Sequence, residues 1–362
     1  MNKKLLSLAV AAAITAPVVA LADATLYGKT HVSIDWFDIK GSDEYKGWAV
    51  NRGKIGKGHG RANRLGVKGS EDLGAGLKAI YQVEFGIPLA NERDYDFDNG
   101  EQSGLKMRNT YVGLKGGFGT FLVGRHDTPL KVSTSKLEMF NDTMADYEDT
   151  LGFDDIRADS TIAYITPSFG GFQFAAAAIP GSASTVDGTK NRKADSLAEG
   201  YSLAATYGNG PWYFGAAYEV LTDQLASIDD AQAANVDTSD YKKWRVGLGI
   251  RDLSGFYLSA IYEKQQSIDF EEKIMVGSKE EDNDADVWQG QLGYAFGNNM
   301  IKGMYGKNKP DSGNETKSWA VGFDHNFSKR AKVYALYTKV DADKGADEDD
   351  WKGFSLGMMY DF

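Results

Sequence analysis

The connections in this chain come in two lengths, and the two lengths alternate along the sequence. Short turns lie at 71–76, 116–119, 168–171, 208–211, 252–255, 297–299 and 328–330. Long polar spans lie near 39–59, 89–104, 129–156, 181–198, 222–240, 268–285, 308–316 and 341–350. These seven turns and eight loops leave sixteen segments of strand length between them. Short turns on one rim and long loops on the other are typical of antiparallel barrels that cross an outer membrane, whereas a soluble sandwich has no reason to alternate so strictly.

Within the predicted strands, apolar and polar side chains alternate with a period of two residues. Trp244, Val246 and Leu248, for example, lie on the face opposite Arg245 and Gly247. This alternation gives each strand one apolar and one polar face. In a membrane barrel the apolar faces meet lipid and the polar faces surround the lumen. The sequence therefore predicts an all-β fold, a sixteen-stranded antiparallel transmembrane β-barrel.

The N-terminal residues 1–22 have the pattern of a secretory signal peptide. Lys3 and Lys4 precede an apolar stretch over residues 5–19, and Ala20-Leu21-Ala22 fits a cleavage site of small residues. Cleavage there would leave residues 23–362 as the barrel domain. The chain contains no cysteine, so an exported barrel is expected to hold without disulfides.

The last predicted strand ends on an aromatic residue, and its apolar face continues to the final position. This face consists of Phe354, Leu356, Met358, Tyr360 and Phe362. A terminal aromatic residue on the lipid face resembles the assembly signal of outer-membrane proteins. In a soluble sheet the same strand would expose a row of large apolar side chains and invite aggregation.

Four segments resemble the general diffusion porins of Gram-negative bacteria, a trimeric family of sixteen-stranded barrels. They are TLYGK (25–29), RANRLGVKGSEDLGAGLKAIYQVE (61–84), RNTYVGLKGGFGTFLVG (108–124) and RADSTIAYITPSFGGF (157–172). The resemblance implies a protein exported through the periplasm to the cell outer membrane, where a homotrimer contacts lipid and lipopolysaccharide. It also implies a water-filled channel for passive diffusion of small hydrophilic solutes and ions.

The long span 129–156 is expected to fold into the barrel as a third loop and to narrow its lumen. A connection of this length inside a compact protein is usually functional or disordered. It is dense in carboxylates, and we expect Glu138, Asp142, Asp146 and Glu148 to form the acidic side of the constriction. The span lacks the Pro-Glu-Phe-Gly-Gly motif of well-known family members. The alternative is a solvated acidic loop on the surface.

The basic side of the constriction is expected to consist of Lys29, Arg64, Arg108 and Arg157. Alternation places Lys29, Arg64 and Arg157 inside the barrel, whereas Arg108 has the same parity as the apolar Val112. The resemblance implies that all four belong to the basic cluster that the family sets opposite its third loop. Such fixed charges create a field across a narrow, water-filled bore.

Arg125 follows the strand that precedes the third loop and is predicted to anchor this loop. It would hold the loop through hydrogen bonds to backbone carbonyls or to Asp127, and the alternative is an ordinary arginine at the rim.

Other functions are weaker alternatives. The chain contains four histidines and no G-x-S-x-G or H-E-x-x-H motif, so no enzyme, metal site or cofactor is predicted, and no nucleic acid is expected as a partner. A substrate-selective porin for a sugar, an anion or a small organic acid is the nearest alternative, and a structural or adhesive barrel is more distant. The net charge of −11 favours cations at the channel mouths, while the basic cluster favours anions, so both signs of selectivity are compatible with the sequence.

Overall fold

The computed structural model describes residues 23–40, 46–51, 61–87, 89, 105–180, 196–221, 241–267, 284–311, 313, 315–342 and 350–362. The predicted signal peptide, residues 1–22, lies outside these ranges. Within the described ranges, no helix is long and apolar enough to cross a membrane.

Strands make up most of the described chain. They are β1 (Thr25–Ile39), β2 (Lys46–Val50), β3 (Arg64–Gly74), β4 (Leu77–Gly86), β5 (Lys106–Met107), β6 (Thr110–Gly116), β7 (Gly119–Asp127), β8 (Arg157–Ile165), β9 (Phe172–Ile179), β10 (Gly200–Asn209), β11 (Trp212–Leu221), β12 (Tyr241–Leu253), β13 (Phe256–Ser267), β14 (Ala285–Phe296), β15 (Asn299–Pro310), β16 (Thr316–Asn326), β17 (Ala331–Ala342) and β18 (Trp351–Asp361). Two short helices, α2 (Pro129–Thr134) and α3 (Tyr147–Leu151), lie between β7 and β8.

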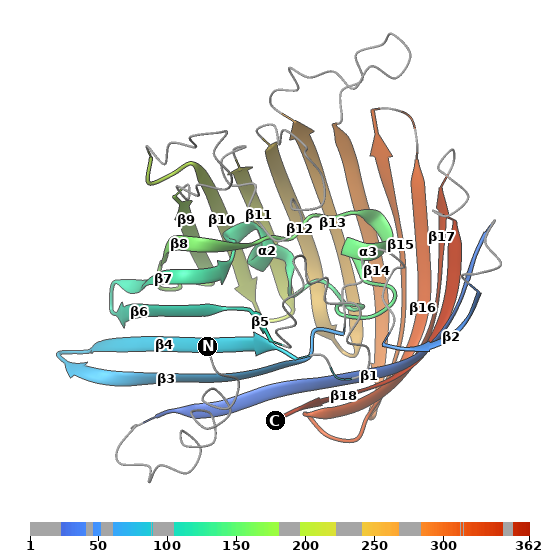
Figure 1. Ribbon diagram of the computed structural model, residues 1–362, viewed down its shortest axis with the longest axis horizontal. Coiled ribbons are helices and arrows are strands. Elements are labelled where there is room, and N and C mark those ends of the chain that lie inside the picture. Colours follow the sequence, from blue (N-terminus) through green and yellow to red (C-terminus); the bar gives the residue numbers. More distant parts are fainter. Residues whose placement is uncertain are drawn as a thin grey trace, which may run out of the picture.

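The strands form one closed antiparallel barrel with sixteen positions (Figure 1). The last strand returns to the first, and β18 pairs with β1 from Lys29↔Asp361 to Ile39↔Trp351. Two positions each contain two short strands. Both β2 and β3 pair with β1, and both β5 and β6 pair with β4. The predicted sixteen-stranded barrel is confirmed, and Lys46–Val50, which the sequence assigned to a long loop, is a strand.

Two asparagine side chains bridge the gap between β2 and β3 along the edge of β1. Asn51 accepts a hydrogen bond from the backbone N–H of Ser33 at 2.7 Å, and Asn63 accepts one from His31 at 2.5 Å. These amides replace the backbone carbonyls that a continuous strand would supply. The two amides therefore satisfy the edge of β1 between its pairing with β2 and its pairing with β3.

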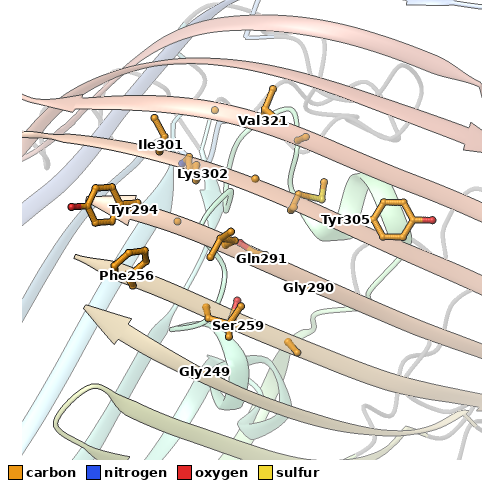
Figure 2. A pocket seen from close by; sticks show the side chains of 18 of the residues that line it. Gly249, Phe256, Ser259, Gly290, Gln291, Tyr294, Ile301, Lys302, Tyr305 and Val321 are labelled. Carbon is orange, nitrogen blue, oxygen red and sulfur yellow. The ribbon is translucent and has the colours of Figure 1, made fainter. Parts of the chain in front are cut away.

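The outer face of the barrel is apolar, as the alternation predicts. Among its exposed side chains are Leu26, Leu248, Leu292, Val321 and Met358. The outer surface over β11 to β18 is hollowed into an apolar groove of about 1380 Å³. In Figure 2, Phe256, Tyr294 and Ile301 lie toward one end of this groove and Tyr305 toward the other, with Gly290 between them. This cavity faces away from the lumen, so it is not the candidate channel.

Trp351 lies on the inner face of the barrel. It is buried and packs in an inner cluster with Ile39, Phe140 and Val340. Its odd number puts it on the face opposite Phe354 and Met358, in agreement with the alternation itself.

Candidate functional site

The connection between β7 and β8 folds into the barrel. The side chain of Thr128 accepts a hydrogen bond from the backbone of Lys131 and so caps the N-terminus of α2. Asp146 caps α3 in the same way, and Gly152 ends α3 with a left-handed conformation. Figure 1 shows both helices within the ring of strands, where α2 lies against β10 to β12 and α3 against β15 and β16. The predicted inward-folded third loop is confirmed, and residues 128–156 are called the inward loop below.

Apolar side chains of the inward loop pack against one side of the inner wall. Phe140 and Met144 join a cluster with residues of β15 to β18. Leu137, Tyr147 and Leu151 join a second cluster with residues of β11, β13 and β14. Among the described residues, neither cluster includes a side chain from β3 to β7. The loop therefore lies against the wall from β11 to β18, and the bore runs between it and the opposite wall.

Glycines on the inner face make room for this loop. A Cβ atom at Gly215 would collide with the carbonyl oxygen of Ser133, and one at Gly306 would collide with Leu151. Alternation assigns such glycines only to the polar face. It does not reveal that the inward loop contacts them, because the loop residues are distant in the sequence.

Buried charges on β12 hold the end of the inward loop. These residues were not among those predicted from the sequence to belong to the site. Arg245 Nη1 lies 2.5 Å from Asp155 Oδ1, and Nη2 lies 2.7 Å from Glu263 Oε2. Lys243 Nζ lies 2.9 Å from Asp154 Oδ2. Lys243, Arg245 and Glu263 are fully buried. Charges without access to water are tolerated when they are paired, so these ion pairs fix the loop to the wall.

Two of the predicted loop carboxylates face the loop itself and the adjacent wall. Glu138 accepts hydrogen bonds from the backbone N–H of Phe140 and, at 2.7 Å, from the Gln291 amide. Burial, reinforced by the charge of Asp146, raises the pKa of Glu138 to about 8. Burial and the charges of Asp149 and Asp142 raise the pKa of Asp146 to about 6. These carboxyl groups therefore titrate close to neutral pH.

A third predicted carboxylate, Glu148, pairs within the loop. Its Oε1 lies 3.4 Å from Lys131 Nζ, and both side chains are partly exposed. The pair ties α3 to α2.

Asp142 is the loop carboxylate that meets the basic wall. Its Oδ2 lies 2.6 Å from Lys29 Nζ on β1. Arg64 is on β3 opposite Lys29 in the register, and its charge also acts on Asp142. Burial alone would raise the pKa of Asp142, but the charges of Lys29 and Arg64 lower it to about 2. Asp142 therefore stays ionised across the physiological pH range.

Arg108 reaches the inner face because of a β-bulge. Pairing of β4 stops at Phe85↔Met107 and resumes at Gln82↔Tyr111, so residues 108–110 lie opposite only two residues of β4. The extra residue shifts the alternation and re-aims the side chain. Arg108 Nε lies 2.8 Å from Glu84 Oε1, and Glu84 also accepts a hydrogen bond from Tyr27.

A second bulge lies between Arg157 and Thr161. His126 pairs with Ala158 and Gly124 with Thr161, and Ser160 has a φ of 53°. The alternation that placed Arg157 on the same face as Thr161 does not continue across this bulge. Arg157 lies at the start of β8, with Nη2 2.9 Å from Asp127 Oδ1 and Nε 2.9 Å from Asn109 Oδ1. Its charge is thus balanced by a neighbouring carboxylate.

Arg125 braces strands at the root of the loop. It donates a hydrogen bond to the carbonyl of Met107, and its Nη1 lies 2.7 Å from Asp159 Oδ1 on β8. Neither partner belongs to the inward loop, so the anchoring of this loop by Arg125 stays a prediction, and the nearby Asp127 is paired with Arg157.

Comparison with known proteins places this barrel in a family. A family model described as Gram-negative porin matches residues 8–345. The major outer membrane protein P.IB of Neisseria meningitidis serogroup B is 28% identical over 377 residues, covering 100% of both chains. The corresponding protein of Neisseria gonorrhoeae is 26% identical and covers 96% of both.

Solved structures share the fold. An anion-selective porin from Comamonas acidovorans superimposes with a TM-score of 0.69 and 19% identity, over 94% of this chain and 99% of that one. OmpF of Salmonella typhi gives a TM-score of 0.66 and 17% identity, over 94% and 97%. With a closed barrel, an inward loop and a family match over most of the sequence, this chain belongs to the Gram-negative porins and is an outer-membrane channel for passive diffusion.

Proposed function

We propose that the narrowest part of this channel lies between Asp142 on the inward loop and a basic wall formed by Lys29, Arg64 and Arg108. The observation that carries the proposal is the 2.6 Å contact between Lys29 and Asp142, which joins the inward loop to β1. Arg157 belongs to the same wall, and Asp127 balances its charge. Glu138, Asp146 and Glu148 contribute to the net charge of the inward loop, and their contacts are within the loop or with the adjacent wall.

A channel of this kind performs no catalytic step. Lys29, Arg108 and Arg157 are each paired with a carboxylate, and the arrangement of charges around the bore suits a transverse field that acts on passing ions and dipolar solutes. Small hydrophilic solutes and ions are the expected cargo, with no nucleic acid as a partner. Outer-membrane lipid and lipopolysaccharide would cover the outward apolar face, including its groove.

Planar bilayer recording tests the proposal directly. Purified protein should insert as open channels whose current in KCl is proportional to voltage. A channel that conducts only after addition of a particular solute would contradict general diffusion and favour the substrate-selective alternative.

We further propose that three copies assemble into a homotrimer. OmpT of Vibrio cholerae, whose fold matches with a TM-score of 0.62, is described in a trimer form. On this chain, the outward residues Leu26, Val67 and Val83 are direct cross-strand neighbours and form an aliphatic row. A row of this kind suits contact with another barrel. Cross-linking in mild detergent should give trimers, and a stable monomer under those conditions would contradict the proposal.

A further inference from the structure

A second group of side chains lies next to the basic wall, on the part of the inner surface that the inward loop leaves open. Arg64, Gly66 and Lys68 alternate along β3 and so share its inner face. The ring of Tyr27 lies across Gly66, where a Cβ atom would be 2.6 Å from Tyr27 Cζ. Lys68 Nζ lies 4.8 Å from the centre of this ring. An aromatic ring is thus flanked by two cations on one strand.

Hydrogen bonds fix the tyrosine rings of this region. The Tyr27 hydroxyl donates to Glu84 Oε2 at 2.8 Å, and the Tyr111 hydroxyl donates to Gln82 Oε1 at 3.4 Å. Glu84 and Gln82 lie two residues apart on the inner face of β4. The rings of Tyr27 and Tyr111 therefore approach β4 from opposite sides. Two half-buried rings are thereby held on one patch of the wall.

The cations of this patch differ from their neighbours in having no ion-pair partner within the described part of the chain. Lys29 is paired with Asp142 and Arg108 with Glu84. Arg64 and Lys68 make no ion pair with another described residue, and Lys68 is exposed. Their positive charge is therefore available to a solute in the lumen.

We propose that Tyr27, Arg64, Lys68, Gln82 and Tyr111 form a binding subsite for small aromatic carboxylates. The two unpaired cations suit the carboxylate, and the edges and faces of the two tyrosines suit the ring of the solute. Gln82 offers an amide to a polar substituent. The subsite rests on the proposed diffusion function and adds to it a binding site for one class of solute next to the constriction.

The test compares benzoate with acetate, two monocarboxylates of equal charge, in planar bilayers containing the purified channel. With sodium benzoate, conductance should saturate as the concentration rises, whereas with sodium acetate it should rise in proportion. Lys68→Gln and Tyr27→Leu should each raise the half-saturating benzoate concentration by about two- to fivefold, the range expected for one exposed cation or ring contact.

Two further variants separate the subsite from general effects. Tyr27→Phe keeps the ring and loses only the hydrogen bond to Glu84, so most of the benzoate saturation should remain. Lys136 lies 5.3 Å above the ring of Tyr213 elsewhere in the chain, and Lys136→Gln is the matched control that should leave benzoate saturation unchanged. Equal behaviour of benzoate and acetate in a channel that conducts KCl would overturn the subsite alone. Absence of any KCl current would instead contradict the diffusion function.

Discussion

Lys29 and Asp142 are 113 residues apart in the sequence, and their charged groups meet at 2.6 Å inside the barrel. The first belongs to the strand that closes the barrel against β18, and the second to the inward loop. Asp142 adopts a left-handed backbone conformation with φ 61°, which few residue types tolerate. Backbone conformations of this kind are found at functional sites where surrounding contacts enforce them. The contact therefore joins the inward loop to β1.

The first prediction concerns the charge of Asp142. Asp142→Asn removes an ionised carboxylate and leaves Lys29 without its ion-pair partner. The reversal potential in a KCl gradient at low salt should shift toward anion preference, because fixed charges in a narrow bore act strongly on passing ions. Glu148→Gln is the control, since Glu148 is paired with Lys131 inside the loop and should shift the potential less. Equal shifts in both variants would contradict the assignment.

The second prediction separates two arginines of the predicted basic wall. Arg64 has no ion-pair partner among the described residues, whereas Arg157 is paired with Asp127. Arg64→Gln should therefore move the reversal potential clearly toward cation preference, while Arg157→Gln should have a smaller effect. The same single-channel recordings should show higher conductance for Arg64→Gln, because its side chain narrows the bore. A larger shift of the reversal potential in Arg157→Gln than in Arg64→Gln would contradict this ranking of the two arginines.

The third prediction concerns the ion pairs that hold the loop. Arg245→Met would leave Asp155 and Glu263 buried without their partner, at a cost of about 3–5 kcal/mol. We expect a lower thermal unfolding midpoint and a noisier open-channel current as the end of the loop leaves the wall. Arg251→Met, on the same inner face of β12 but exposed, is the control and should leave both quantities nearly unchanged. A quiet current in Arg245→Met would show that the apolar contacts hold the loop alone.

The alternation of side chains, together with the alternating lengths of the connections, predicted the barrel. The outward position of Leu26 and Val67 and the inward position of Arg64 follow from a period of two residues, and that period continues wherever the strands are regular. It does not extend across a bulge. The resemblance implied an inward Arg108 although its parity opposed this, and the inserted residue after Met107 gives a physical reason why parity fails there.

The attachment of the inward loop was not predictable in the same way. Alternation placed Arg245 on the polar face, but its partner Asp155 is 90 residues away and no local pattern joins them. The sequence predicted that Glu138, Asp142, Asp146 and Glu148 form the acidic side of the constriction. In the structure Glu138 turns to β14, Glu148 pairs with Lys131 within the loop, and Asp142 meets Lys29 on β1. Asp154 and Asp155 turn to β12. Packing in three dimensions determines which carboxylate remains in the channel.

The last prediction concerns pH. The pKa of Asp146 is raised to about 6 and that of Glu138 to about 8, so both groups lose protons as the pH rises through these values. The loop then gains negative charge, and the reversal potential should move toward cation preference between pH 5 and pH 9 (a range set by these two pKa values). Glu138→Gln should remove the upper part of this change and keep the lower part. Asp142 stays ionised throughout and contributes no step.

The same titrations affect stability with a definite sign. The pKa of Glu138 is raised above its ordinary value of 4.5. The stability that the protonated group contributes is therefore fully present below pH 4.5, decreases as the pH rises, and is lost by about pH 8. Ionised Glu138 would lie near ionised Asp146, with Lys302 and the Gln291 amide as its favourable neighbours. The thermal unfolding midpoint of the parent should therefore fall as the pH rises from about 6 to about 8, where Glu138 is protonated in the folded chain and ionised in the unfolded chain. Glu138→Gln should abolish this fall, and a parallel decrease in both proteins would assign it to groups outside the inward loop.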